Sequence, residues 1–175
     1  MPIVNLRWCA DPSLVFLLVD FFIEHTSVAY ISHGEVLDGR AEGPSVWSAD
    51  LRAVLVEEFS ACSFTGEPLS ESGVWIAVAE DDTGLLAFAV VEFSARVRSP
   101  SARLHDLVVH RSRRNSGVGN KLLDWIEASV SKGGGRWMVL ESGLSNHAAH
   151  TFFERRGYEP TSCVMMKRLT PKVPR

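Results

Sequence analysis

The sequence predicts a single α/β or α+β domain organised around a central sheet. Three observations support this fold class: a length of 175 residues, a composition with 46% hydrophobic and 22% charged residues, and helical and strand-like patterns that mix along the whole chain. A chain of this size buries roughly 70% of its unfolded surface, so it needs neither a metal ion nor a disulfide for stability. We therefore expect residues 1–175 to form one domain.

The first third of the chain combines one strand with two helices. Asp11 followed by Pro12 is typical of an N-cap and a first helical position, and Ser48 is a suitable cap for the second helix. Between the helices, three glycines and a proline interrupt every period, which indicates a loop. In chain order we expect a strand at 3–8, a helix at 10–25, a loop at 26–46 and a helix at 48–61.

Strand-like runs dominate from Ser72 onward. The turn "DDTG" joins two β-rich runs into a hairpin, and three consecutive glycines end a helix whose apolar stripe includes Val118, Leu122 and Ile126. We expect strands at 73–80, 85–97 and 103–109, a helix at 118–132, a strand at 136–142, a helix at 146–156 and a last strand at 162–169.

Charge, cysteines and hydropathy exclude several classes of protein. The net charge of −3 and the pI near 6.1 argue against a general nucleic-acid binder. The apolar run at 14–23 is too short to span a bilayer and contains Asp20, so we expect a buried helix and no membrane partner. Cys9, Cys62 and Cys163 are far apart and form no CxxC pair, which favours a reducing, cytoplasmic compartment over a zinc site.

The stretch "HRSRRNSGVGNKLLDWIEASV" places three arginines and two glycines directly before a helix. The first turn of a helix has unpaired N–H groups and a partial positive charge, so this pattern favours a bound diphosphate. A dinucleotide fingerprint would need a third glycine where Leu122 stands, and no Walker motif occurs. An ordinary helix entrance with solvated arginines remains open on this pattern alone.

Two segments resemble the GCN5-related N-acetyltransferase (GNAT) superfamily. "DLVVHRSRRNSGVGNKLL" resembles its acetyl-CoA-binding strand and [RQ]-x-x-G-x-[GA] helix start, within residues 104–132. "LESGLSNHAAHTFFERRGY" resembles the second cofactor segment, within residues 136–158, through Asn146, Ala149, Phe152, Phe153, Gly157 and Tyr158. The resemblance implies a central mixed, mostly antiparallel sheet whose middle strands splay apart, flanked by helices.

The resemblance also implies which residues bind acetyl-CoA. The backbone of Leu107, Val108 and Val109 would pair with the acetyl carbonyl and the pantetheine arm. Asn146 would contact the pantetheine or thioester region, whereas Phe152 would belong to the core. The amides that would hold the pyrophosphate belong to Arg114, Asn115, Ser116, Gly117, Val118, Gly119 and Asn120.

The implied activity is transfer of an acetyl group from acetyl-CoA to a primary amine, most simply that of a small molecule. An alkyl amine with a pKa near 10.4 is protonated at neutral pH, so a general base is needed. The candidate bases are Asp106, Glu92 and Glu141, with His105 on the opposite face of a regular strand. Phe153 stands where the family often has the tyrosine that protonates the departing thiolate, so this acid is missing.

Several alternatives stay open at this point. Phe153 is compatible with a CoA-binding module that has little turnover, and the acceptor could be a protein lysine or N-terminus. His147 and His150 lie one helical turn apart, but no third ligand presents itself and the resemblance implies no metal. The loop at 25–47 is expected to help select the acceptor, and a homodimer is compatible with the sequence.

Overall fold

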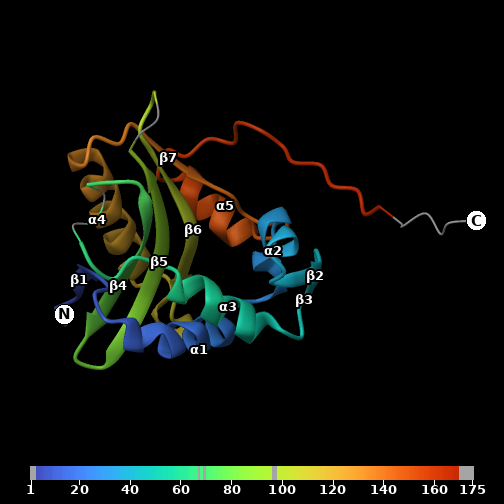
Figure 1. Ribbon diagram of the computed structural model, residues 1–175, viewed down its shortest axis with the longest axis horizontal. Coiled ribbons are helices and arrows are strands. Elements are labelled where there is room, and N and C mark those ends of the chain that lie inside the picture. The colour runs from blue at the N-terminus through green and yellow to red at the C-terminus, as the bar shows by residue number, and fades with distance from the viewer. Residues whose placement is uncertain (1–2, 67, 69, 96–97, 170–175) are drawn as a thin grey trace, which may run out of the picture.

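A five-stranded sheet in the order β1-β4-β5-β6-β7 forms the centre of the protein (Figure 1). The structure is a computed structural model that describes residues 3–66, 68, 70–95 and 98–169. All neighbouring strands are antiparallel except β6 and β7, which are parallel. The strands are β1 (Asn5–Trp8), β4 (Gly73–Asp81), β5 (Gly84–Ser94), β6 (Ser101–Val109) and β7 (Trp137–Leu140), and a separate pair is formed by β2 (Ala41–Gly43) and β3 (Val46–Trp47).

Helices cover both faces of this sheet. One face packs against α1 (Val15–His25) and α3 (Leu51–Ser60), and the other packs against α4 (Val118–Lys132) and α5 (His147–Glu154). The short α2 (His33–Leu37) lies beside β2 and β3 (Figure 1). Three 3₁₀ turns complete the order: Pro12–Leu14, Val28–Tyr30 and Arg111–Arg113.

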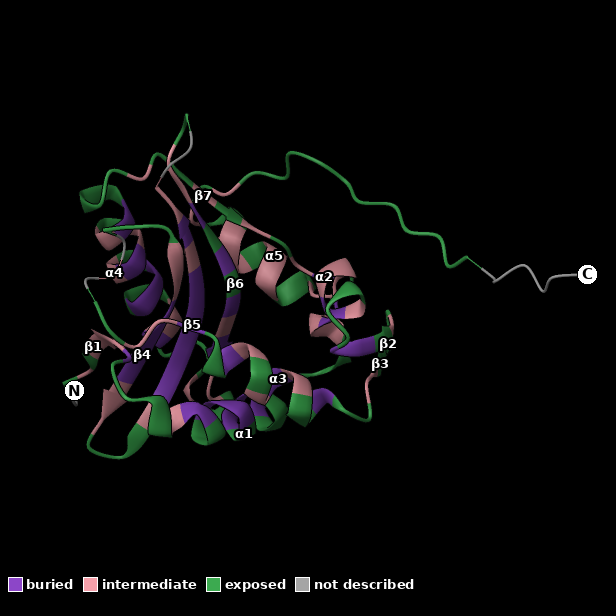
Figure 2. Cartoon of the chain, viewed as in Figure 1, coloured by how far each residue is buried: buried purple, intermediate pink, exposed green. Residues whose placement is uncertain are grey.

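The central strands are buried on both faces because alternate side chains enter two separate cores (Figure 2). On β4, Ala77 and Ala79 pack toward α4, whereas Ile76 and Val78 pack toward α1 and α3. The small alanines let α4 approach its side of the sheet closely, and its own residue Leu122 is fully buried there. The predicted fold class, a mixed α/β domain around a central sheet, is therefore confirmed.

A β-bulge interrupts β6 in the middle of the sheet. Asp106 pairs with Val90 and Leu104 pairs with Val91, so His105 is an extra residue without an opposite partner on β5. The alternation therefore changes sides at this point: Leu104 belongs to the core beneath α4, yet so does Leu107, three residues later. Asp106 is consequently buried toward the α1 and α3 side, which regular alternation does not predict.

The two strands β6 and β7 separate halfway along their length. They pair from Ser101 with Trp137 to Leu104 with Leu140, and β7 then ends. The second half of β6, residues 105–109, still pairs with β5 but has no neighbouring strand on its other side in the described part of the chain. The splayed middle strands implied by the resemblance are therefore present.

Two local expectations differ from the structure, and part of a third lies outside the described residues. Asp11 caps the first 3₁₀ turn rather than an α-helix, through the Ser13 N–H at 2.9 Å, and α1 begins only at Val15. The expected loop at 26–46 contains α2, which has a capping box formed by Ser32 and Glu35. Residues 96–97 of the expected strand at 85–97 lie outside the described residues.

The expected last strand at 162–169 is wrong for this structure. Residues 159–169 form neither helix nor strand, and Figure 1 shows them leaving the body of the protein as an extended arm. No described strand pairs with these residues, and an apolar run forms a strand only where it pairs with a sheet edge. Within the described residues, no helix is long and apolar enough to cross a membrane.

Candidate active site

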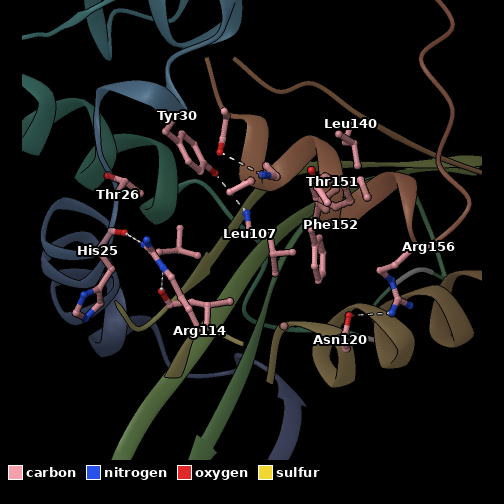
Figure 3. A pocket seen from close by; sticks show the side chains of 18 of the residues that line it. His25, Thr26, Tyr30, Leu107, Arg114, Asn120, Leu140, Thr151, Phe152 and Arg156 are labelled. Atoms are coloured by element: carbon pink, nitrogen blue, oxygen red, sulfur yellow. Dashed lines mark hydrogen bonds between the residues drawn. The ribbon is translucent and has the colours of Figure 1, made fainter. Parts of the chain in front are cut away.

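A large cleft opens where β6 and β7 separate. Its volume is about 1210 Å³, and its walls come from β6, the start of α4, α5 and the segment that follows α1 (Figure 3). On the β6 side, the backbone of residues 105–109 faces the cleft without a neighbouring described strand. Such a space suits an extended ligand that pairs with a strand edge.

The turn before α4 forms one end of the cleft. Gly117 is the N-cap residue and has a φ of 88°, and Asn115 also has a positive φ of 61°. The first intrahelical hydrogen bond runs from the Lys121 N–H to the Gly117 carbonyl at 3.0 Å, so the four amides from Gly117 to Asn120 have no helical acceptor. The amides of Arg114 and Ser116, which were also expected to bind the pyrophosphate, instead donate to the carbonyls of Arg111 and Arg113. A Cβ at Gly119 would lie 3.2 Å from Val109 Cγ2, which explains how the helix start packs so closely on β6.

Arg114 lines this end of the cleft, and Arg111 adds a second positive charge close to Arg114 without lining the cleft itself. The Arg114 guanidinium donates to the carbonyl of His25, and Arg111 donates to the carbonyl of Thr26 at 2.9 Å. Partial burial, with a smaller contribution from Arg111, lowers the pKa of Arg114. Among the described residues, neither arginine has a carboxylate within 4.0 Å, so both charges remain available to an anion.

The wall formed by β6 presents a backbone N–H next to a tyrosine. The Leu107 N–H donates to the Tyr30 hydroxyl at 3.4 Å (Figure 3), and that hydroxyl donates to Asp106 Oδ1 at 2.8 Å. Burial, together with the charge of Asp106, raises the pKa of Tyr30, so the phenol stays protonated. The long bond to Leu107 leaves that N–H ready for a better acceptor.

Asp106 itself is buried in an ion-pair network. Arg40 donates to its two oxygens at 3.0 and 3.1 Å and also binds Glu58, to which its Nε donates at 2.7 Å. Burial raises the pKa of Glu58, although Arg40 opposes this effect. Both Asp106 oxygens accept hydrogen bonds and the residue does not line the cleft, so the carboxylate holds Tyr30 and Arg40 in place.

The other two carboxylates expected from the sequence lie nearer to solvent. Glu92 does not line the cleft, and its Oε2 accepts a hydrogen bond from His105 Nε2 at 3.0 Å. His105 does line the cleft, at the bulge. Glu141 lines the cleft at the end of β7 and contacts His33 Nε2 at 3.2 Å and Arg103 at 2.8 Å.

Residues of α5 close the remaining side. Asn146 caps this helix by accepting from the Ala149 N–H at 3.3 Å, and it lines the cleft. Phe152 and Phe153 both line the cleft and both contact the core beneath α4, with ring centroids 5.1 Å apart. Phe152 is therefore a wall of the cleft as well as a core residue, contrary to the expectation that it belongs to the core alone.

The sequence predicted a role for the segment after α1 in acceptor selection but identified none of its residues. Tyr30 and Glu35 line the cleft, and His33 and Arg40 bind the carboxylates next to it. The capping box of α2 was the one local signal that this segment is ordered. His147 and His150 have ring centroids 6.0 Å apart, and the described part of the chain contains no group of three residues that could hold a metal ion.

Comparison with known proteins agrees with this geometry. The family described as "Acetyltransferase (GNAT) domain" matches residues 71–160, which is slightly more than half of the chain. No curated protein sequence matches significantly. Among solved structures, a tetramutant of the BH1408 protein from Bacillus halodurans superposes with a TM-score of 0.70 at 16% identity, covering 94% of this chain and 99% of its own.

Two further solved structures share the fold. A putative acetyl transferase from Pyrococcus furiosus has a TM-score of 0.64 at 20% identity and covers 95% of this chain and 100% of its own. The aminoglycoside N-acetyltransferase AAC(6')-Iy in complex with CoA has a TM-score of 0.63 at 14% identity, with 97% and 96% covered. On the match of the family to residues 71–160, this chain belongs to the GNAT acetyltransferases.

Proposed function

We propose that this protein transfers the acetyl group of acetyl-CoA to the primary amine of a small molecule. The observation that carries the proposal is one continuous cleft with an anion site at one end and the exposed edge of β6 at the other. The four amides from Gly117 to Asn120, which have no helical acceptor, and the charge of Arg114 suit a pyrophosphate. The backbone of Leu107, Val108 and Val109 suits the pantetheine arm, with Asn146 opposite.

Acetyl-CoA supplies an activated thioester carbonyl when it is bound. The amine nitrogen attacks this carbon, the C–S bond breaks, and the electrons leave with sulfur as a thiolate. The Leu107 N–H would stabilise the negative charge that develops on the carbonyl oxygen. This N–H is available because its present hydrogen bond to the Tyr30 hydroxyl is long, at 3.4 Å. When the Leu107 N–H binds the substrate oxygen, the Tyr30 hydroxyl still donates to Asp106, and this hydrogen bond keeps Tyr30 in position.

His105 is the proposed general base, and Glu92 orients it. A neutral imidazole can accept a proton at physiological pH, and this one lines the cleft beside the exposed edge of β6. The contact of 3.0 Å with Glu92 selects the ring orientation and stabilises the imidazolium that forms. Glu141 is the second candidate because it also lines the cleft, whereas both oxygens of Asp106 are occupied.

A smaller cavity next to the cleft favours a small cationic acceptor. It has a volume of about 250 Å³ and lies between α2, the middle of β6 and the segment that follows β7. Its acidic lining residues are Glu35, Asp38 and Glu141, of which Glu35 and Glu141 pair with the arginines Arg40 and Arg103 that also line it, so Asp38 is the carboxylate most available to an ammonium group. Carboxylates attract an ammonium group, and the limited volume disfavours a folded protein surface as acceptor.

No tyrosine is present at position 153 to protonate the departing thiolate. Phe153 lines the cleft but carries no proton to donate. A thiol with a pKa near 8.5 is a good leaving group, so a water molecule can protonate it after the C–S bond breaks. We therefore expect catalysis without a dedicated acid, at a rate set by amine deprotonation or product release.

Release of CoA thiol with a panel of amines tests this proposal. The panel should include an aminoglycoside, a linear diamine and a peptide with a free N-terminus. The wild-type protein should release thiol above the hydrolysis rate only when a small amine is present. If the peptide alone is acetylated, the small-molecule acceptor is wrong, and if no amine increases thiol release, the protein only binds acyl-CoA.

Two variants test the proposed base. His105→Gln should lower kcat by about 10²–10⁴-fold without changing the acetyl-CoA affinity measured by calorimetry. Glu92→Gln should lower kcat less. His147→Gln is the matched control because His147 is exposed on α5 and should leave kcat unchanged. Unchanged kcat in His105→Gln would transfer the role to Glu141.

A further inference from the structure

The ion pair between Arg40 and Asp106 lies almost entirely out of solvent. Arg40 is 8% exposed and Asp106 is 1% exposed. Removing two charges from water costs about as much free energy as their attraction provides. A buried ion pair therefore often stabilises a fold no better than hydrophobic side chains of similar volume. Stability alone does not explain this pair, and its place in the sheet indicates another role.

Asp106 lies in the least supported stretch of β6. The bulge leaves His105 without a partner on β5, and on the other side β7 pairs with β6 only as far as Leu104. Within the described residues, His105 is thus paired with neither neighbouring strand. The ladder of hydrogen bonds that fixes the rest of β6 is interrupted at this point.

Side chains support the strand where this ladder is interrupted. The two oxygens of Asp106 accept hydrogen bonds from Arg40 at 3.0 and 3.1 Å, and Oδ1 also accepts one from the Tyr30 hydroxyl at 2.8 Å. A planar guanidinium that binds both oxygens of a carboxylate fixes its orientation as well as its position. The backbone on each side of Asp106 is therefore held from the α1 and α3 face of the sheet.

Arg40 itself is fixed from other directions. Its Nε donates to Glu58 on α3 at 2.7 Å, and its guanidinium carbon lies 5.5 Å from the centre of the Phe22 ring on α1. The carboxylate of Glu35 lies 3.9 Å from Arg40 Nη1. The described contacts of the guanidinium are thus with side chains of the protein, so Arg40 acts on the reaction through other residues.

The residues on each side of Asp106 are the two groups that the proposed reaction uses. His105 is the proposed base, and the Leu107 N–H is the proposed donor to the carbonyl oxygen; both residues line the cleft. We propose that Arg40 is a positioning residue: through Asp106 it fixes the bulge of β6 and so the relative placement of these two groups. The kinetic consequences rest on the proposed function, whereas the effect on the backbone at the bulge is independent of any reaction.

A double replacement separates placement from stability. Arg40→Met/Asp106→Val keeps the total volume close to that of the pair and removes both charges. Glu58 and Tyr30 each lose a partner, but the Glu58 side chain is 29% exposed and Tyr30 lines the cleft, so water can replace that partner. The variant should therefore fold, with a Tm no more than about 5 °C below that of wild type.

Amide hydrogen exchange reads the bulge directly. In Arg40→Met/Asp106→Val, the amides of residues 105–108 should exchange about tenfold faster than in wild type, because the side-chain support is lost. Ala102 pairs with strands on both sides and should exchange as before.

Kinetics read the consequence for the reaction. In the same double variant, kcat should fall by about 10–100-fold, because a displacement of about 1 Å at reacting groups has an effect of this order. The Kd of acetyl-CoA should change by less than about fivefold, because the anion site lies at the start of α4. Arg40→Lys keeps the charge and Asp106 but lacks the planar fork, so its kcat should lie between those of wild type and the double variant.

The matched control is an ion pair on the opposite edge of the sheet. Arg7 on β1 donates to Glu80 on β4 at 3.0 Å, and neither residue lines the cleft. Arg7→Met/Glu80→Val should leave both kcat and the exchange at residues 105–108 as in wild type.

Unchanged exchange at residues 105–108 in Arg40→Met/Asp106→Val would overturn the proposal, whatever the kinetics show. Faster exchange with unchanged kcat would also overturn it, because the bulge would then not govern the reaction. If the double variant does not fold, Arg40→Lys carries the same test at a Tm close to that of wild type. If the wild-type protein acetylates no amine, the proposed function fails, and the exchange experiment alone decides whether Arg40 fixes the bulge.

Discussion

Gly143 is the point where the segment after β7 touches the segment after α1, and its replacement by alanine should push the two apart. A Cβ at this position would lie 2.3 Å from the carbonyl oxygen of Ile31 and 2.8 Å from that of Ala29. Both are backbone atoms, so no side-chain rotation relieves the clash. Restoring an ordinary contact of 3.4 Å requires a displacement of about 1 Å.

This displacement has a calculable effect on stability. Overpacking of this kind costs about 1–3 kcal/mol, and two rigid backbone contacts place Gly143→Ala near the upper end. For a chain of this length, we expect Tm to fall by roughly 5–10 °C. Gly34→Ala is the matched control, because its nearest non-local atoms would lie at 3.5 Å or more and its φ is not left-handed. That variant should melt within about 2 °C of wild type.

The same variant should separate acceptor binding from cofactor binding. The contact between His33 and Glu141 crosses the displaced junction, so KM for the amine should rise. The helix start at Gly117 is on the other side of the cleft, so the acetyl-CoA affinity measured by calorimetry should stay within about twofold. A Tm within 1–2 °C of wild type, or equal losses of both affinities, would refute this reasoning.

Two further outcomes are expected. Phe153→Tyr should change the free energy of unfolding by less than about 1 kcal/mol, because the added hydroxyl enters the cleft. Single-turnover rates should rise only if departure of the thiolate limits the rate. A variant that melts far below wild type would show that position 153 is not part of the site. Burial, and to a smaller extent the charge of His110, lowers the pKa of His25 in the folded state. As the pH is lowered, the unfolded chain therefore protonates His25 near pH 6.5, before the folded chain does. Stability should therefore fall as the pH is lowered from 7.5 to 5.5, and His25→Gln should flatten that fall in urea titrations; an identical slope in both proteins would contradict the assignment.

Local signals were sufficient for much of the fold. The hairpin of β4 and β5 follows from two apolar runs joined by a tight turn, and α4 follows from a stripe that includes Val118 and Ile126. The helix entrance at Gly117 could also be predicted, because a left-handed residue there has few sequence alternatives. In each case the determining interactions lie within about one turn or one strand pair of the residue concerned.

Long-range pairings were beyond a reading of the sequence. Arg40 and Asp106 are 66 positions apart, and nothing near either residue indicates that they form a buried ion pair. The bulge at His105 depends on how β6 pairs with β5, so the sequence alone placed His105 and Asp106 by regular alternation. The apolar run at 162–169 is compatible with a strand, but a strand also needs an edge to pair with.

The gap between β6 and β7 has a consequence for the lifetime of the protein in a cell. An unliganded chain keeps half of β6 without a neighbour on one side, so this region should open more often than the rest of the sheet and be the first that proteases reach. A ligand that occupies the gap reduces the open population by the factor 1 + [L]/Kd. The abundance of the protein would then follow the supply of acyl-CoA. When acyl-CoA is scarce, proteolysis of the protein would be faster and its concentration would fall.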